Sequence, residues 1–140
     1  YGAFSPDRYA DAEHLVLIAG GVGIAPMMSI LRTMVDRGDT RPVTLLYGSR
    51  DWDNIAYREE LAELEQRLKL RVVHVLERAP EGWQGETGFV TDQVLARHLP
   101  AAVDYHVFLC GPLGMLNAVE AALAKLNVPE TRIHLERFDL

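Results

Sequence analysis

The sequence predicts an α/β fold in which helices cover both faces of a parallel sheet. Short apolar segments alternate along the chain with segments whose apolar residues recur at helical spacing. The predicted strands are apolar rather than alternating, which is typical of parallel strands buried on both faces. Because crossovers between parallel strands are right-handed, this order allows a doubly wound sheet. We therefore predict a three-layer αβα domain with a five-stranded sheet in the order 3-2-1-4-5.

The expected elements follow one another with short connections. The five strands are predicted over residues 15–19, 43–47, 71–76, 104–110 and 132–135. The helices are predicted over residues 24–37, 55–68, 92–98 and 113–126. Gly38 is a natural C-cap for the first helix, and Thr91 or Asp92 can cap the third. Residues 77–88 are predicted to form a loop rich in glycine.

Composition limits the functions that the chain can have. Its 140 residues, 49% of them hydrophobic, suit one domain with a buried core. The net charge of -6 argues against a nucleic-acid partner. A single cysteine excludes an internal disulfide, a cysteine-rich zinc site and an iron–sulfur cluster held by this chain. The five histidines lack ligand spacing, so we expect no metal site. No apolar run approaches the ~20 residues of a membrane span.

A glycine turn after the first strand is the clearest candidate binding motif. A strand, a glycine turn and a helix start in succession form a cradle for phosphate, because free N–H groups and the helix dipole favour an anion there. The turn resembles G-x-G-x-x-G, but Pro26 stands where the third glycine belongs. The alternative is a tight turn that binds no ligand. The residues expected at the cradle are Gly20, Gly21, Gly23, Ile24, Ala25 and Pro26.

Polar residues follow the second strand, where ligands of doubly wound sheets bind. Ser49 can donate a hydrogen bond and Arg50 can pair with a phosphate, which favours a 2′-phosphate on a bound nucleotide. Asp51 can serve a ribose 2′-OH instead, and a plain surface turn is the further alternative. Tyr57 or Trp52 can stack on an adenine, or pack against the second helix.

Cys110, Gly111 and Pro112 end the fourth strand and lead into a helix on which Met115 lies. A helix N-terminus generally lowers the pKa of a nearby thiol, whereas the alternative is a small buried residue at a tight turn. Gly111 and Pro112 permit a planar ligand to approach the backbone. A P-loop NTPase is excluded because no Gly-Lys-Ser/Thr follows the glycine turn, and a hydrolase because the chain has no G-x-S-x-G.

Four segments together resemble a known family. Residues 19–27 (AGGVGIAPM), 45–51 (LLYGSRD), 108–115 (FLCGPLGM) and 136–138 (ERF) look like the NAD(P)-binding domain of the ferredoxin–NADP reductase superfamily, the C-terminal nucleotide-binding domain of a flavin reductase. The pattern is closest to bacterial ferric-reductase-like and NADPH-oxidase-like flavoproteins. Tyr1 and Gly2 look like the end of an FAD-binding domain. We therefore expect residues 1–14 to end a linker from a missing FAD-binding domain and residues 15–140 to form the NAD(P)-binding domain.

The resemblance implies an enzyme module. It implies binding of NADPH or NADH, hydride transfer to FAD held mainly by the upstream domain of the same polypeptide, and single-electron transfer to an acceptor. That acceptor can be haem, an iron chelate, oxygen or an iron–sulfur protein. The alternatives are a non-catalytic regulatory module that binds nucleotide and the reductase component of an oxygenase. The expected location is the cytoplasm, or the cytosolic portion of a membrane-anchored reductase.

The resemblance also assigns roles to residues. Cys110 is expected beside the hydride-transfer atoms, Glu136 matches the terminal acid near flavin N5, and Phe138 matches the aromatic that covers the flavin ring. Phe stands where plant-type members have Tyr, and two residues follow it. The residues expected to bind cofactor are Gly20, Gly21, Gly23, Ile24, Ala25, Pro26, Ser49, Arg50, Tyr57, Cys110, Gly111, Pro112 and Met115.

Overall fold

The computed structural model describes residues 12–101 and 104–137, with the side chain of residue 137 excepted. Six parallel strands form one sheet in the order β4-β3-β2-β1-β5-β6. The strands are β1 (His14–Gly20), β2 (Val43–Asp51), β3 (Leu70–Arg78), β4 (Glu86–Thr87), β5 (Tyr105–Gly111) and β6 (Ile133–Arg137). The helices are α1 (Ile24–Asp36), α2 (Arg58–Arg67), α3 (Asp92–His98) and α4 (Leu113–Lys125), with 3₁₀ turns η1 (Gly21–Gly23), η2 (Trp52–Asn54) and η3 (Glu130–Arg132).

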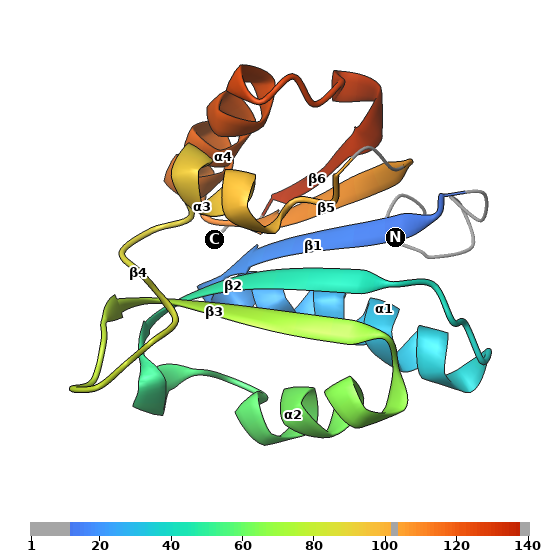
Figure 1. Ribbon diagram of the computed structural model, residues 1–140, viewed down its shortest axis with the longest axis horizontal. Coiled ribbons are helices and arrows are strands. Elements are labelled where there is room, and N and C mark those ends of the chain that lie inside the picture. The colour runs from blue at the N-terminus through green and yellow to red at the C-terminus, as the bar shows by residue number, and fades with distance from the viewer. Residues whose placement is uncertain (1–11, 102–103, 138–140) are drawn as a thin grey trace.

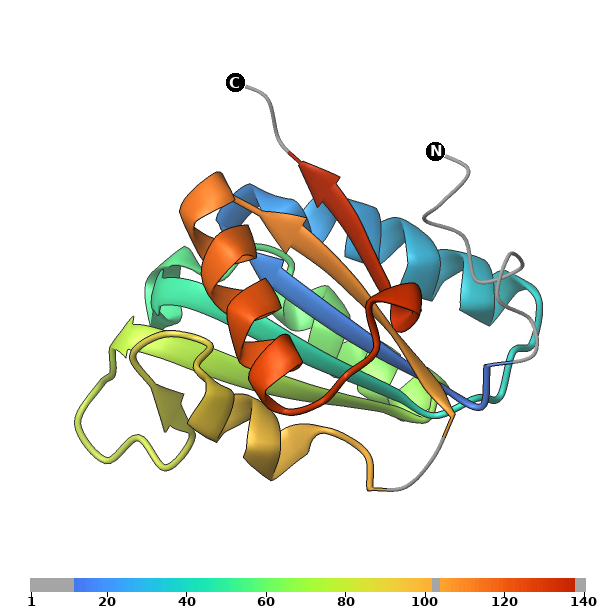
Figure 2. The same ribbon diagram turned by 90° about the horizontal axis from the view of Figure 1, so that it is seen from above.

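Helices cover both faces of the sheet. In Figures 1 and 2, α1 and α2 lie on one face, and α3 and α4 lie on the other. β1 lies inside the sheet between β2 and β5, and its residues 15–20 are all buried. Its side chains alternate between two apolar clusters, with Leu15 and Leu17 facing one way and Val16 and Ile18 the other. This double burial explains why the strand is apolar at consecutive positions.

The predicted fold class and strand order are confirmed. The five predicted strands correspond to β1, β2, β3, β5 and β6, which lie in the predicted order 3-2-1-4-5. The structure adds β4 at the edge beside β3, inside the segment that we predicted to be a loop. β4 has only two residues, Glu86 and Thr87, and both are polar. A segment so short has no apolar periodicity, so the pattern could not reveal it.

The second strand is longer than predicted. The sequence predicts that this strand ends at residue 47, but β2 continues to Asp51, and Ser49 pairs with Leu76 of β3. The predicted turn after this strand is therefore wrong for Ser49 and Arg50, which belong to the strand itself. The pairing with β3 extends the strand beyond its apolar part, because backbone hydrogen bonds do not require apolar side chains.

The helix ends follow local rules. Gly38 has φ 64°, and the N–H of Asp39 beyond it donates to the carbonyl of Met34 at 2.9 Å, which closes α1 as predicted. The hydroxyl of Thr91 accepts from the N–H of Val94 at 3.3 Å and caps α3. α2 begins at residue 58 instead of the predicted 55, because Tyr57 has a left-handed backbone with φ 61°.

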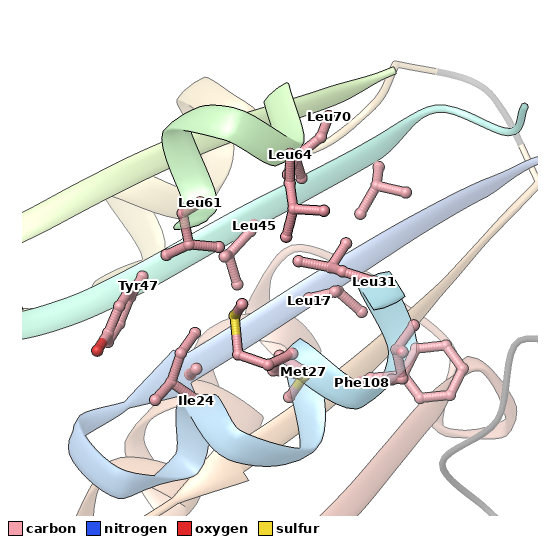
Figure 3. Packing of buried hydrophobic residues seen from close by; sticks show 14 of the residues in the cluster. Leu17, Ile24, Met27, Leu31, Leu45, Tyr47, Leu61, Leu64, Leu70 and Phe108 are labelled. Carbon is pink, nitrogen blue, oxygen red and sulfur yellow. The ribbon is translucent and has the colours of Figure 1, made fainter. Parts of the chain in front are cut away.

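The larger apolar cluster fills the space between the sheet and helices α1 and α2. Figure 3 shows Met27 and Leu31 of α1, Leu61 and Leu64 of α2 and the aromatic ring of Phe108 directed into it. The smaller cluster lies under α3 and α4. In the part of the chain that the structure describes, no helix has both the length and the apolar character that crossing a bilayer requires.

A pair of phenylalanines tests this assignment of the core. Phe108 is fully buried in the larger cluster, whereas Phe89 is 69% exposed. We expect Phe108→Ala to lower the free energy of unfolding by ~3–5 kcal/mol, because it leaves a large cavity. Urea denaturation measures this change. The control variant Phe89→Ala should stay within about 0.5 kcal/mol of the parent. Equal losses in the two variants would contradict the assignment.

Candidate functional site

A cavity of about 600 Å³ lies at the carboxyl ends of the central strands. Its volume falls within the ~300–1,000 Å³ of small-molecule sites, and its position is where doubly wound sheets bind their ligands. It draws together the ends of β1 and β2, the segment before α3 and the first turns of α4. Its lining residues are Gly20, Gly21, Gly48, Ser49, Arg50, Glu77, Gly88, Phe89, Val90, Pro112, Gly114, Met115, Ala118 and Val119.

The glycine turn crosses the end of β5 at very close range. A Cβ placed on Gly23 would overlap the carbonyl of Cys110, so no other residue fits there without moving the backbone. A Cβ on Gly20 would overlap the thioether of Met115 in α4. These contacts lock η1 between β5 and α4, and they place Gly20 and Gly21 on the cavity wall.

Only part of the predicted phosphate cradle lines the cavity. Gly20 and Gly21 do so, whereas Gly23, Ile24, Ala25 and Pro26 are not among the lining residues. The N–H of Ile24 donates to the carbonyls of Gly21 and Val22, and Pro26 has no N–H. Neither residue therefore supplies a backbone donor to a ligand.

Ser49 and Arg50 stand on the cavity wall at the end of β2. Ser49 is only 8% exposed, and its Oγ forms no hydrogen bond of full geometry within the residues that the structure describes, although it interacts with the phenol of Tyr47. A ligand oxygen in the cavity would complete the hydrogen bonding of this buried hydroxyl. The Arg50 side chain is exposed beside it. A nucleotide phosphate fits this combination of an arginine and a serine hydroxyl.

Asp51 is committed elsewhere. Its Oδ1 accepts from the backbone N–H of Asn54 at 3.0 Å and from the side-chain amide of Asn54 at 2.7 Å, which caps η2. It is not among the residues that line the cavity. The acid that does line the cavity is Glu77, at the end of β3. Glu77 does not stand out in the sequence, because the predicted third strand ends at residue 76, one residue before it.

The two predicted adenine-stacking residues do not border the cavity. Trp52 lies under the guanidinium of Arg58, 4.5 Å from its ring centroid, and beside Trp83 at 5.7 Å between centroids. Tyr57 lies under the guanidinium of Arg32 at 5.5 Å. Neither Tyr57 nor Trp52 is among the lining residues.

Phe89, unlike Tyr57, is an aromatic residue that borders the cavity. Its ring is 69% exposed and borders the cavity, between Gly88 with φ 84° and the buried Val90. An exposed phenylalanine beside a nucleotide-sized cavity is a suitable stacking platform for a base. A signal existed in the sequence, since an aromatic residue directly follows a glycine at the end of the predicted glycine-rich loop.

Cys110 and Glu136 are register partners on the neighbouring strands β5 and β6. Cys110 is fully buried, and burial together with the charge of Glu136 raises the pKa of its thiol to about 11. The expectation of a lowered thiol pKa is therefore wrong, because desolvation outweighs the nearby helix N-terminus. Cys110 and Gly111 lie behind the cavity wall, which Pro112 and Met115 form. Phe138 lies outside the described residues.

Comparison with known proteins identifies the family. Over residues 17–121 the sequence matches the family described as the oxidoreductase NAD-binding domain, which is more than half of the chain. The chain belongs to this family. The resemblance to the ferredoxin–NADP reductase superfamily is thereby confirmed, and so is NAD(P)H as the cofactor class of the domain.

Relatives of this NAD-binding domain are reductases with further domains. The chain is 40% identical over 124 residues to an NADH-cytochrome b5 reductase 1 of Lodderomyces elongisporus, and the match covers 86% of the chain and 41% of that protein. The structure superposes on the FAD/NAD-binding domain of a Vibrio cholerae nitric oxide dioxygenase with a TM-score of 0.80 and 29% identity, covering 91% of this chain and 52% of that one. The structure also superposes on an Amycolatopsis cytochrome P450 reductase with a TM-score of 0.80 and 32% identity, and this match covers 95% of this chain and 40% of that one. The chain thus spans less than half the length of its curated relatives.

The raised pKa of Cys110 predicts that its thiol reacts slowly with alkylating reagents. At pH 8 a thiol with a pKa of about 11 is ionised in roughly one molecule in a thousand, against about one in four for an ordinary cysteine. We expect iodoacetamide to modify the folded NAD-binding domain at least about a hundredfold more slowly than the urea-unfolded chain. Mass spectrometry follows the reaction at the single cysteine.

The same shift affects stability. Because the folded thiol holds its proton more tightly than the unfolded one, its contribution to stability is complete below pH ~8.5 and is lost as the pH rises toward 11. A folded-state labelling profile with a midpoint near pH 8.5 would contradict the burial of Cys110. The variant Cys110→Ser controls for modification at other side chains.

Proposed function

We propose that this chain is the NAD(P)H-binding domain of a flavoprotein oxidoreductase. The whole enzyme takes hydride from NAD(P)H onto FAD bound to another domain of the same polypeptide, and then passes single electrons to an acceptor. The observation that carries the proposal is the cavity at the carboxyl ends of the strands, where a glycine turn, an arginine, a buried serine and an exposed aromatic ring meet.

Each part of the cavity suits one part of a nicotinamide dinucleotide. The glycine turn at Gly20 and Gly21 offers backbone N–H groups to the pyrophosphate without side chains in the way. Ser49 and Arg50 face the ribose 2′ position, and Phe89 offers an apolar face to adenine. Bound nicotinamide supplies a hydride to flavin, and the protein contributes position and a dry environment.

A buried, neutral thiol lies behind the cavity wall at the end of β5. Cys110 stays a neutral thiol at physiological pH because burial and Glu136 raise its pKa. A neutral thiol neither attracts a proton from the nicotinamide nor repels the electron-rich ring. Gly111 beside it carries no side chain, so the ring can approach the backbone. We assign Cys110 and Glu136 to this end of the site.

A haem protein is the acceptor that the relatives favour. The named relative is a reductase of cytochrome b5, and one of the similar structures is a flavohemoglobin from Malassezia yamatoensis with bound FAD and haem. The second candidate is the reductase component of an oxygenase, which similarity to a cytochrome P450 reductase favours. A ferric-reductase role and a purely regulatory role remain predictions of the sequence. Cys110 and Glu136 favour catalysis over regulation, because nucleotide binding alone does not require them.

Flavin reduction tests the proposal. We expect anaerobic NADPH to bleach the flavin absorbance of the full-length, FAD-loaded protein in stopped-flow measurements. Gly21→Val, which directs a side chain at the cavity, should slow reduction at limiting NADPH by about tenfold or more. Gly38→Val is the matched control, because Gly38 also has a positive φ but lies at the end of α1, away from the cavity. Absence of bleaching despite bound FAD would favour the regulatory alternative.

Nucleotide preference is a separate prediction. We expect NADPH to raise the melting temperature more than NADH, because Arg50 and Ser49 on the cavity wall suit a 2′-phosphate. Arg50→Ala should weaken NADPH binding by about tenfold or more and leave NADH binding nearly unchanged. Scanning calorimetry and titration calorimetry measure the two effects, with the exposed Arg67→Ala as control. An equal or larger shift with NADH would refute the preference, and would assign the ribose 2′-OH to Glu77.

A further inference from the structure

We propose that Glu86 is a positioning residue for nucleotide binding: its ion pairs hold the segment that carries Phe89 against the cavity. The inference rests on the proposed function, since it concerns how the adenine platform is kept in place. Glu86 lies three residues before Phe89 and does not line the main cavity. It therefore acts on the nucleotide through the backbone that follows it.

The carboxylate of Glu86 joins β4 to the last turn of α3. Its two oxygens accept from the guanidinium of Arg97, with Nε–Oε2 at 2.9 Å and Nη2–Oε1 at 2.6 Å. Oε2 also accepts from Nε2 of His98 at 2.7 Å. The other ring nitrogen of His98 lies against the guanidinium of Arg71 in β3, which can only donate. Nδ1 of His98 is therefore the acceptor, and Nε2 carries the hydrogen and donates it in a hydrogen bond to the Glu86 carboxylate.

Few other contacts hold the segment around Glu86. β4 pairs with β3 over two residues, and Nε1 of Trp83 donates to the carbonyl of Glu86 at 3.0 Å. Gly82 and Gly88 both have positive φ, and Gly85 packs against the indole of Trp83, so glycines interrupt the segment throughout. Glycine-rich backbone loses much conformational entropy when it is ordered. A bidentate arginine pair with a third donor is the strongest single anchor that offsets this loss.

The ion pairs of Glu86 affect the position of Phe89 through the short stretch of backbone between the two residues. Beyond Glu86, the N–H of Gly88 donates to the carbonyl of Leu76 at 2.8 Å, and Val90 is buried against the second cluster. Phe89 thus stands between two fixed neighbours, with its own ring 69% exposed at the cavity. Loss of the Glu86 ion pairs would leave the N-terminal side of this short segment less restrained. The carboxylate is 16% exposed, which limits competition from water.

The anchor holds over the whole physiological pH range. The Arg97 guanidinium, and to a smaller extent His98, lowers the pKa of the Glu86 carboxyl to about 2. A carboxyl with a folded-state pKa below its unfolded value stabilises the fold above pH ~4.5, and this contribution disappears as the pH falls toward 2. The position of Phe89 therefore does not depend on small pH changes near neutrality.

The test uses ADP-ribose, which has adenine and pyrophosphate but no nicotinamide, with the full-length FAD-loaded protein. We expect Glu86→Gln to weaken ADP-ribose binding about two- to tenfold, the contribution of one aromatic stacking contact, in titration calorimetry. The KM for NADPH should rise by the same factor while kcat stays unchanged. Phe89→Ala should have a similar effect, and the double variant should bind no more weakly than Phe89→Ala alone. Arg97→Gln removes the guanidinium that pairs with Glu86, and it should weaken ADP-ribose binding by the same factor as Glu86→Gln.

A matched ion pair provides the control. Arg32 and Glu60 join α1 to α2 through two bonds of 2.8 Å, and neither lines the main cavity, so Glu60→Gln should leave ADP-ribose affinity unchanged. Additive losses in the double variant, or wild-type affinity in both Glu86→Gln and Arg97→Gln, would overturn the positioning role and leave the proposed function intact. Wild-type protein that binds no ADP-ribose would instead overturn the proposed function.

Discussion

The crossing of the glycine turn over the end of β5 is the constraint on which the rest of the site depends. Gly23 approaches the carbonyl of Cys110 so closely that a methyl group would not fit. This contact fixes where α1 starts, since η1 leads directly into it. Gly20, which precedes the turn, lies against the thioether of Met115 at the cavity wall. The path of the chain from β1 into α1 thus depends on one steric contact between backbones.

The fold could be predicted because the sheet is buried on both faces. β1 needs apolar residues at consecutive positions, and that requirement is visible without coordinates. Gly38 and Thr91 likewise revealed helix ends through local chemistry. The short edge strand β4 was missed because two polar residues carry no periodic signal, and β2 was ended early because Ser49 and Arg50 are polar. Backbone pairing, which is blind to side-chain type, decided both cases.

Some of the predicted site residues line the cavity, and others do not. Ser49, Arg50 and Pro112 reach the cavity because strand ends converge at one edge of a parallel sheet. Tyr57 does not, since its left-handed backbone directs the chain into α2 and leaves its ring with Arg32. Phe89 was overlooked because its exposure depends on the anchored segment before it. The thiol pKa of Cys110 was misjudged because the depth of burial is a tertiary property.

The central place of β1 has a consequence for synthesis of the chain. Its first neighbour, β2, is complete at residue 51, but its second neighbour, β5, ends only at residue 111. One edge of the most apolar strand therefore stays unpaired while some sixty further residues leave the ribosome. Non-local pairings of this kind slow folding and expose strand edges to aggregation. During translation, the strand that anchors the finished domain is its most vulnerable segment.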